Sequence, residues 1–354
     1  VASLLSWSVR SGIGPVRACI GIIGTMKASC IALLFIMAGG CFAQKRDAEF
    51  NKLADRFFDE LYFKYDPVQG TAAGFHQYDA MLPSATRLEI DAQIGVLKKF
   101  ESEVDGFGAQ GLSPLAGADR DLMLAQIRAQ LLTLEVVRPW EKNPDVYSSG
   151  ATNAVYVIMS RSFAGAAVRL KSVIAREKLI VRVFQSAREN LKNPPQVYTE
   201  IALEQLPGIL SFFQNDVPAA FKDVNDTQLM AEFKQANQGV LDALTAYQGF
   251  LKNDLLPRSH GEFRIGAETY RKKLLYDEMV DIPLDRLLEI GTANLHRNQE
   301  EFKRVAAQVD KTRTAEQILT ETLQDHPEGG KLLPTFRDVL GGLREFIEKH
   351  KIVT

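Results

Sequence analysis

The sequence predicts a mostly α-helical protein, organised as one domain of long packed helices. Apolar residues recur at intervals of three and four along nearly every segment, which places them on one face of an α-helix. Proline, glycine and capping residues separate these segments, as expected at helix ends. Alternation of apolar and polar residues, which is typical of a half-buried strand, is confined to GEFRIGAETY, where Phe263 and Ile265 flank Arg264.

Three helices are predicted between residues 50 and 139, and we expect them to form one helical layer. The first ends at Asp66-Pro67, and the third ends at Pro139. Pro83-Ser84 marks the start of the second, and Gly106 marks its end. The apolar positions that define them are Phe50, Leu53, Phe57 and Leu61, then Ile90, Ile94, Leu97, Phe100 and Val104, then Leu124, Ile127, Leu131 and Leu134.

The middle of the chain, residues 151–195, is one long apolar-periodic region that ends at Pro194-Pro195. Strands at Val155 to Met159 are an alternative, but Ala, Arg and Leu dominate the continuation and favour helix. Residues 229–251 follow a heptad-like pattern, which also permits a coiled coil. Core packing is favoured, because the pattern lasts only about three heptads and lacks systematic flanking charge pairs.

The last part of the chain predicts further helices. Leucine and phenylalanine positions mark a long helix over residues 284–305, and Thr314 with Gln317 forms a capping-box sequence for the next one. Apolar periodicity continues from Phe336 to Ile347. The final KIVT has the β-branched character of a beginning strand.

Residues 26–43 have the three parts of a secretory signal: Lys27, an apolar run from Ile31 to Met37, and small residues up to Ala43. The run is shorter than the roughly 20 residues of a membrane span. We therefore expect an exported chain, periplasmic or secreted, with no transmembrane segment after signal removal. Residues 1–25 are interpreted as an extension upstream of the true start, and residues 44–354 as the helical domain.

Cys41 offers an alternative to simple cleavage after Ala43. Small residues precede it, as in lipoprotein signals, so acylation of Cys41 would give a lipid-anchored outer-membrane lipoprotein. Cleavage is favoured, because Ala38 stands where such signals carry a large aliphatic residue. Cys19, Cys30 and Cys41 are the only cysteines, and all lie in the leader. The exported domain therefore has no disulfide, thiolate metal site or cysteine nucleophile.

Charge excludes one class of partner. The chain has 42 Lys and Arg against 44 Asp and Glu, and the two signs are interspersed. No basic cluster interleaved with aromatic residues is present, so nucleic-acid binding is not expected. The apolar content of 46% supports a substantial core.

The sequence contains none of the HExxH, GxSxG, Walker or glycine-rich dinucleotide motifs. Its five histidines are His76, His260, His296, His326 and His350. None of them is paired at the spacing that brings two imidazoles to one metal on a helix. We therefore predict no catalytic residue and no metal ligand within this chain.

Two polar segments remain as candidates for lining a cleft. In GFHQYD, His76 and Asp79 could be a base and its orienting carboxylate, with Tyr78 as a hydrogen-bond donor. The alternative is a structural turn in which Asp79 caps and Tyr78 packs, and it is favoured. In RIGAETYRKKL, Tyr270 and Arg271 could reach a cleft, although Glu268 and Lys272 have the spacing of a surface ion pair.

Five segments in order carry a family resemblance: YDPVQGTAAGFHQYDAMLP, WEKNPDVY, ARENLKNPP, FRIGAETYRKKL and LREFIEKHKIVT. Together they resemble the bacterial domain-of-unknown-function 885 family, from about residue 48 onward. The resemblance implies an exported helical protein similar to zinc metallopeptidases of the gluzincin type. In that family a His-Glu pair and a Pro-Gly-His element lie in the carboxy-terminal half, after a segment like IVT(L/I)P.

The chain therefore resembles the amino-terminal half of a larger helical zincin-like fold. The resemblance implies zinc for a full-length relative, and one wall of a cleft for peptides or small molecules from this half. The alternative is a stand-alone periplasmic helical module for binding or scaffolding. A third hypothesis is a truncated product with an exposed apolar face.

Overall fold

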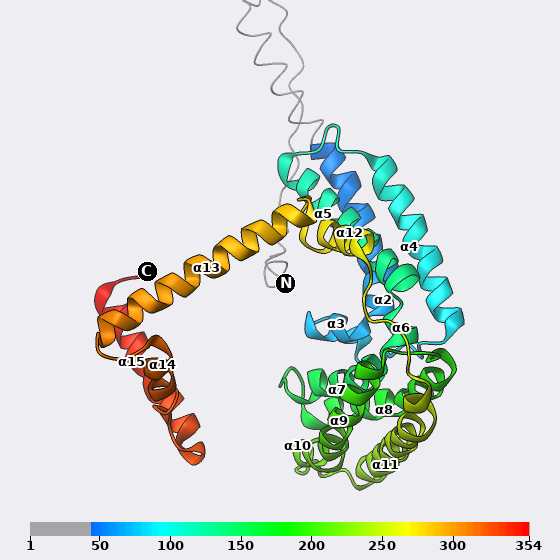
Figure 1. Cartoon of the computed structure of the whole chain (residues 1–354). Helices are drawn as coiled ribbons and strands as arrows, with labels where there is room; N and C mark the ends of the chain where they lie inside the picture. The colour runs from blue at the N-terminus through cyan, green and yellow to red at the C-terminus, as the bar shows by residue number, and fades with distance from the viewer. Residues whose placement is uncertain (1–43, 354) are drawn as a thin grey trace, which may run out of the picture. The chain divides into compact units, whose positions relative to one another are not determined.

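The computed structural model describes residues 44–353, and it confirms the mostly α-helical prediction. Residues 44–353 contain helices, turns and irregular segments but no β-strand. The chain divides into two compact units, Val1–Asp281, described from residue 44, and Ile282–Thr354, described to residue 353. Figure 1 shows the course of the helices within each unit.

The first unit begins with helical residues 44–57. The elements that follow are η1 (Phe58–Tyr62), α2 (Phe63–Tyr65), α3 (Pro67–Ala72), η2 (His76–Tyr78), α4 (Arg87–Phe107), α5 (Pro114–Leu132), η3 (Thr133–Val137), α6 (Pro139–Lys142), α7 (Asp145–Met159), α8 (Ala166–Asn190), α9 (Gln196–Ser211), η4 (Phe212–Asp216), α10 (Val217–Ala220), α11 (Thr227–Phe250), η5 (Leu251–Leu255), η6 (Leu256–Arg258) and α12 (Ala267–Glu278). The second unit contains α13 (Leu284–Val309), α14 (Ala315–Thr322), η7 (Gly329–Lys331) and α15 (Leu332–His350).

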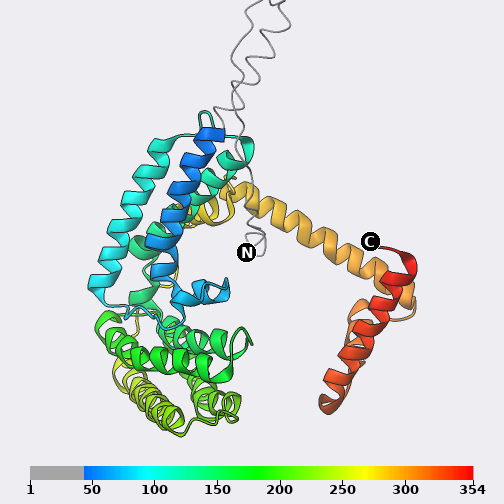
Figure 2. The same ribbon diagram turned by 180° about the vertical axis from the view of Figure 1, so that it is seen from behind.

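The predicted helical layer is present as the first core of the unit. Helical residues 44–57, η1, α4 and α5 bury their apolar faces together, and Phe57 meets Phe100 edge to face at 5.8 Å between ring centroids. Figure 2 shows the first helix in blue beside α4 in cyan. Helix α12 packs along α5.

Both ends of α4 lie within about one turn of the positions predicted from the sequence. The helix starts after Thr86, whose side chain accepts from the Glu89 N–H while the Glu89 carboxylate accepts from the Thr86 N–H. Ser84 instead donates to that carboxylate at 2.7 Å. The helix ends at Gly108, not Gly106, because only Gly108 has a positive φ, of 67°, which glycine adopts without strain.

The second core lies among α7, α8, α9 and α11. The heptad-like series is buried in it, from Leu229 through Val240 and Leu244 on α11 to Leu251 at the start of η5, so core packing is confirmed. Phe184 on α8 meets Tyr247 on α11 at 4.8 Å between ring centroids. The apolar-periodic region of residues 151–195 is mostly helical, as favoured, and Val155 to Met159 lie in α7. Residues 160–165 divide the region between α7 and α8.

Within residues 44–353, four long helices change to a π turn near their carboxy-terminal ends, at η1, η3, η4 and η5. Three of these turns lie two residues before a proline: Pro139 after η3, Pro218 after η4 and Pro257 after η5. Proline has no N–H to donate to a carbonyl of the preceding turn. The carbonyls at the helix end must therefore accept hydrogen bonds from other N–H groups. At η3 the Arg138 N–H reaches back five residues to the Thr133 carbonyl at 2.7 Å.

In the second unit, α14 starts with the predicted capping box of Thr314 and Gln317. Ala306 on α13 and Ile318 on α14 are buried. The strand expected at KIVT was wrong for the described residues 351–353. Lys351 adopts the left-handed conformation, and the Ile352 N–H returns to the Ile347 carbonyl at 3.2 Å, so these residues close helix α15.

None of the helices that the structure describes is both long and apolar enough to cross a bilayer.

Candidate functional site

The centre of the candidate site is Arg176, a fully buried cation on α8. Its guanidinium donates to backbone carbonyls from three parts of the first unit, at 2.6 Å to Ala154, and at 3.2 Å to Pro67, Tyr78 and Met81. Burial lowers the pKa of Arg176 to about 10, while Asp79 and Asp66 oppose this change. The side chain therefore remains a cation at neutral pH and fixes the turn that follows α3.

Thr71 connects Arg176 to the predicted turn. Its hydroxyl oxygen accepts from Nη2 of Arg176 at 2.7 Å, and the hydroxyl donates to Oδ1 of Asp79 at 2.7 Å. Both Thr71 and Asp79 are buried. The Thr71 hydroxyl thus bridges the Asp79 carboxylate and the Arg176 guanidinium, two groups of opposite charge.

His76 completes this polar chain at the surface. Its Nδ1 lies 3.1 Å from Oδ2 of Asp79, and its ring stacks on Phe163 with centroids 3.8 Å apart. The side chain is 41% exposed. Because Nδ1 faces a carboxylate, the arrangement favours the tautomer with its proton on Nδ1, which leaves Nε2 as the basic nitrogen. An imidazole oriented in this way can accept a proton or bind a polar ligand.

Tyr78 is placed as a packing residue. It is buried, and its ring lies 5.6 Å from that of Phe63. A Cβ atom added at Gly70 would stand only 2.8 Å from Cδ2 of Tyr78, so glycine allows this close approach. The backbone carbonyl of Tyr78, as described above, accepts from Arg176.

Tyr270 and Arg271 lie on α12, and both are exposed. Arg271 pairs with Glu268 at 3.4 Å and with Asp281 at 3.8 Å, and Glu268 also pairs with Lys272 at 3.6 Å. These are contacts on or next to the same helix, and they do not join Arg271 to the His76 cluster. Cys41, the candidate for lipidation, lies outside the described residues.

A second buried acid follows Arg176 on the same helix. Glu177 is fully buried, and Oε1 accepts from Nδ2 of Asn237 on α11 at 3.0 Å. Within residues 44–353 its Oε2 has no hydrogen-bond partner. Burial raises the pKa of Glu177 to about 8. Sequence reasoning missed both residues, although each lies in phase with the apolar positions Leu170 and Val173 of α8.

The first unit also contains a pocket of about 230 Å³ between the loops around α3 and helices α7 and α8. Its walls are mostly apolar and aromatic, including Tyr65, Trp140 and Tyr147, and Asp66 is the carboxylate in its lining. Sequence reasoning did not identify this pocket. Residues 44–353 contain no group of three or more His, Cys, Asp or Glu side chains placed to hold a metal ion.

The family comparison covers most of the chain. The family described as "Bacterial protein of unknown function (DUF885)" matches residues 67–354. The chain belongs to the DUF885 family. This match contains the His76 cluster and the pocket residues from Pro67 onward, while Tyr65 and Asp66 of the pocket lie just before it. No curated protein matches the chain significantly.

The fold of this DUF885 chain is similar to a solved structure titled "The structure of a putative lipoprotein of unknown function from Shewanella oneidensis". The two share 21% sequence identity with a TM-score of 0.67. The similar region covers 86% of this chain and 58% of the Shewanella chain. This chain therefore spans less than two thirds of that protein, and the likeness concerns the fold alone.

Proposed function

We propose that this chain is the helical, non-catalytic part of an exported zinc-metallopeptidase-like hydrolase that acts on peptides. In this proposal the metal motif belongs to residues that follow Thr354 in the complete protein. Membership of the DUF885 family and similarity to part of a longer protein support it. The observation that carries the proposal is the apolar surface of the second unit.

Helices α13 and α15 expose apolar side chains at helical spacing. The exposed residues are Leu288, Leu295, Phe302, Val305 and Val309 on α13, and Phe336, Val339, Leu340, Leu343 and Phe346 on α15. Leu340, for example, is 61% exposed. An exposed apolar helix face usually marks an interface, because burying it releases about 25 cal/mol for each Å² removed from water. We assign this face to packing against the catalytic part of the complete protein.

The residues described here do not fit a zinc site of their own, because three protein ligands are needed and no such group is present in residues 44–353. We therefore assign no catalytic step to zinc in this chain. The proposed contribution of the chain is a wall of the cleft, with His76 and Asp79 as polar contacts and Tyr270 with Arg271 as further candidates. Their exposure allows each of His76, Tyr270 and Arg271 to meet a ligand.

The deciding experiment uses the complete gene product. Zinc is measured per chain by atomic emission, and hydrolysis of a mixture of short peptides is followed by mass spectrometry. We expect one zinc per chain and cleavage that a chelator abolishes. A metal-free, inactive complete protein would refute the proposal.

The cleft assignment has a separate test in the same protein. Replacing Arg271 by Ala should change KM for a cleaved peptide by more than it changes the melting temperature, because exposed ion pairs contribute little to stability. Arg286→Ala is a matched control, since Arg286 is exposed and pairs with Glu289 at 2.8 Å on α13. Equal KM values for both variants and the unmodified protein would remove Arg271 from the cleft.

The second candidate function is a stand-alone periplasmic module for binding or scaffolding. The pocket beside Trp140 favours it, because a formed apolar pocket can bind a ligand without catalysis. The coding sequence after Thr354 separates the two candidates. An in-frame continuation with a His-Glu pair supports the hydrolase, and an immediate stop codon supports the module.

Export is proposed for either function, with cleavage after Ala43 or acylation of Cys41 as the two routes. Mass spectrometry of the mature amino terminus distinguishes them. We expect a chain that begins at Gln44. A diacylglycerol-modified Cys41 at the terminus would establish the lipoprotein alternative instead.

A further inference from the structure

The pocket of the first unit is lined by segments that are distant in sequence. Residues 65–68 with Leu82, Pro83 and Ala85 form one side, and Trp140, with residues from α7 and α8, forms the other. At about 230 Å³ it is smaller than the 300 to 1,000 Å³ of typical drug-sized sites. Its size therefore suits a small molecule or one residue of a larger ligand.

Hydrogen bonds hold two of its walls in place. Nδ2 of Asn190 donates to the Ala85 carbonyl at 2.7 Å and to the Tyr147 hydroxyl at 3.0 Å. The Tyr147 hydroxyl donates in turn to the Trp140 carbonyl. Ala85 has a φ of 56°, a left-handed conformation that costs a non-glycine residue about 1 kcal/mol. The wall is thus fixed in a strained shape by a polar network behind it.

Gly150 keeps the pocket open on the side of α7. It lies inside the helix, where glycine is about 1 kcal/mol less favourable than alanine. A Cβ atom built at Gly150 would meet no other atom within 4 Å, so packing does not require glycine there. Because Gly150 lines the pocket, the missing side chain leaves space that a ligand can use.

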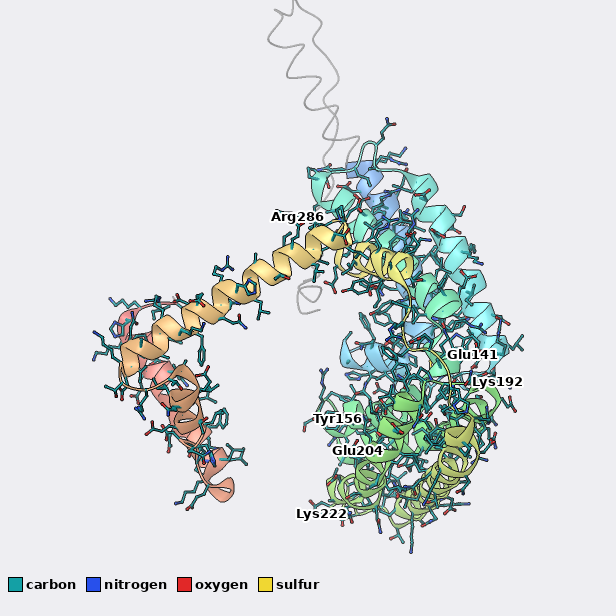
Figure 3. The ribbon with its side chains drawn as sticks, in the orientation of Figure 1. Glu141, Tyr156, Lys192, Glu204, Lys222 and Arg286 are labelled. Atoms are coloured by element: carbon teal, nitrogen blue, oxygen red, sulfur yellow. The ribbon has the colours of Figure 1, made fainter. Side chains whose placement is uncertain are left out.

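Asp66 supplies the carboxyl group of the pocket. It is exposed, and Oδ1 accepts from the Gln69 N–H at 3.1 Å at the start of α3. It has no ion pair among residues 44–353, although it is the carboxylate of an otherwise apolar lining. The guanidiniums of Arg87 and Arg138 lie beside the Trp140 ring. Each already has an acidic partner: Arg87 pairs with Asp91, and Arg138 pairs with Glu141. Figure 3 labels Glu141. Burial raises the pKa of Asp66, while the Gln69 N–H and the Arg176 guanidinium oppose this change. The pocket therefore places, next to aromatic rings, a carboxylate that forms no direct ion pair with another described residue.

We propose that this pocket binds a primary ammonium group carried on a small apolar body, with the ammonium on Asp66 and the body between Trp140 and Tyr147. Aromatic walls and one carboxylate together favour an organic cation over a neutral or anionic ligand. Two sources present this chemistry: a free arylalkylamine and the amino-terminal residue of an apolar peptide. The proposal does not depend on the peptidase function.

The test uses the full chain with Trp7→Phe, so that Trp140 is its only tryptophan. Phenethylamine is titrated by calorimetry and by Trp140 fluorescence, with N-acetylphenethylamine as the neutral analogue. The peptide Phe-Gly-Gly and its N-acetyl form make up the second arm. We expect the amine to bind with a Kd at least about tenfold lower than that of its acetylated analogue, because acetylation removes the charge. If phenethylamine binds and Phe-Gly-Gly does not, the ligand is a free amine. If both compounds bind, the pocket also accepts the amino terminus of a peptide.

Two variants test the named residues. Asp66→Asn should weaken amine binding about tenfold or more while keeping the helix cap, since Asn caps helices as well as Asp. Gly150→Leu should abolish binding by filling the pocket. Gly95→Leu on α4 is the matched control, because it also lies within a helix with no atom within 4 Å of a built Cβ. Circular dichroism checks that each variant is folded.

Three results would overturn the proposal. The first is no heat and no fluorescence change with either amine at millimolar concentration. The second is equal affinity for phenethylamine and its acetylated analogue, which would show that charge plays no part. The third is unchanged amine binding in folded Asp66→Asn or Gly150→Leu, which would place the ligand elsewhere.

Discussion

Nη2 of Arg176 donates to the hydroxyl oxygen of Thr71 at 2.7 Å, and both side chains are buried in the first unit. The two residues are 105 positions apart in the sequence. This hydrogen bond joins α8 to α3 and, through Thr71, to the turn that carries Asp79 and His76. The stability of that turn should therefore depend on a side chain of a distant helix.

Replacing Arg176 by Met should destabilise the protein by about 3 to 5 kcal/mol, because it leaves the Asp79 carboxylate without its cation and several carbonyls without donors. Urea unfolding followed by circular dichroism measures the change. Arg176→Lys keeps the charge but cannot donate in so many directions, so it should also lose stability, by a smaller amount. A loss below about 1 kcal/mol for Arg176→Met would contradict the assigned role.

Glu177 should make stability depend on pH. Because its pKa is raised to about 8 from an ordinary value near 4.5, the folded state holds a proton that the unfolded state releases across this interval. Stability should therefore fall as the pH rises from about 4.5 to 8, at a cost of a few kcal/mol at most.

Glu177→Gln removes this titration and can still accept from Asn237. We expect the variant to exceed the unmodified protein in stability at pH 8.5 and to match it at pH 4.5, as measured by urea unfolding at both values. A difference between the two proteins that stays constant over this range would show that Glu177 does not titrate on unfolding.

Two glycines should respond oppositely to alanine. A Cβ atom at Gly261 would lie 2.2 Å from the Asn193 carbonyl oxygen and 2.9 Å from the Pro194 carbonyl carbon, both of them backbone atoms. Gly261→Ala should therefore cost about 1 to 3 kcal/mol, because the two loops must separate. Gly150→Ala should be neutral or stabilising by up to about 1 kcal/mol, since its Cβ meets open space. Thermal unfolding compares them, and equal melting temperatures would contradict the close approach at Gly261.

The apolar surface of α15 should control self-association of the chain. Replacing Leu340 and Leu343 by Lys should reduce association without loss of helix, because both side chains are more than half exposed. Light scattering coupled to size exclusion measures the mass. Lys substitutions at Arg337 and Arg344, on the same helix, keep the charge and serve as controls. A chain that is monomeric before substitution, at high concentration, would show that this face does not drive association.

The helical pattern could be predicted because it depends on local spacing of apolar residues. Burial of Leu229, Val240 and Leu244 on one face of α11 follows directly from their intervals. The turn between residues 160 and 165 was missed, since its small residues do not interrupt the apolar pattern strongly. The π turns were also missed. A π turn differs from an α-helical turn in which carbonyl accepts each N–H, and this difference does not require particular residue types.

The candidate site was predictable only in its local part. His76 and Asp79 are three residues apart, so their contact could be inferred from sequence. The link from Asp79 through Thr71 to Arg176 depends on how α3 and α8 pack, as does the contact between Glu177 and Asn237, 60 positions away. The catalytic interpretation of His76 and the cleft interpretation of Tyr270 and Arg271 stay predictions.

Arg176 and Glu177 are adjacent on α8, and they engage different neighbours: the segment around α3 on one side and α11 on the other. A rotation of α8 about its own axis would withdraw one side chain from its partners while driving the other into its neighbour. The two sets of contacts therefore prevent α8 from rotating about its own axis. A motion of the first unit that preserves both sets must move α3, α8 and α11 together as one rigid body.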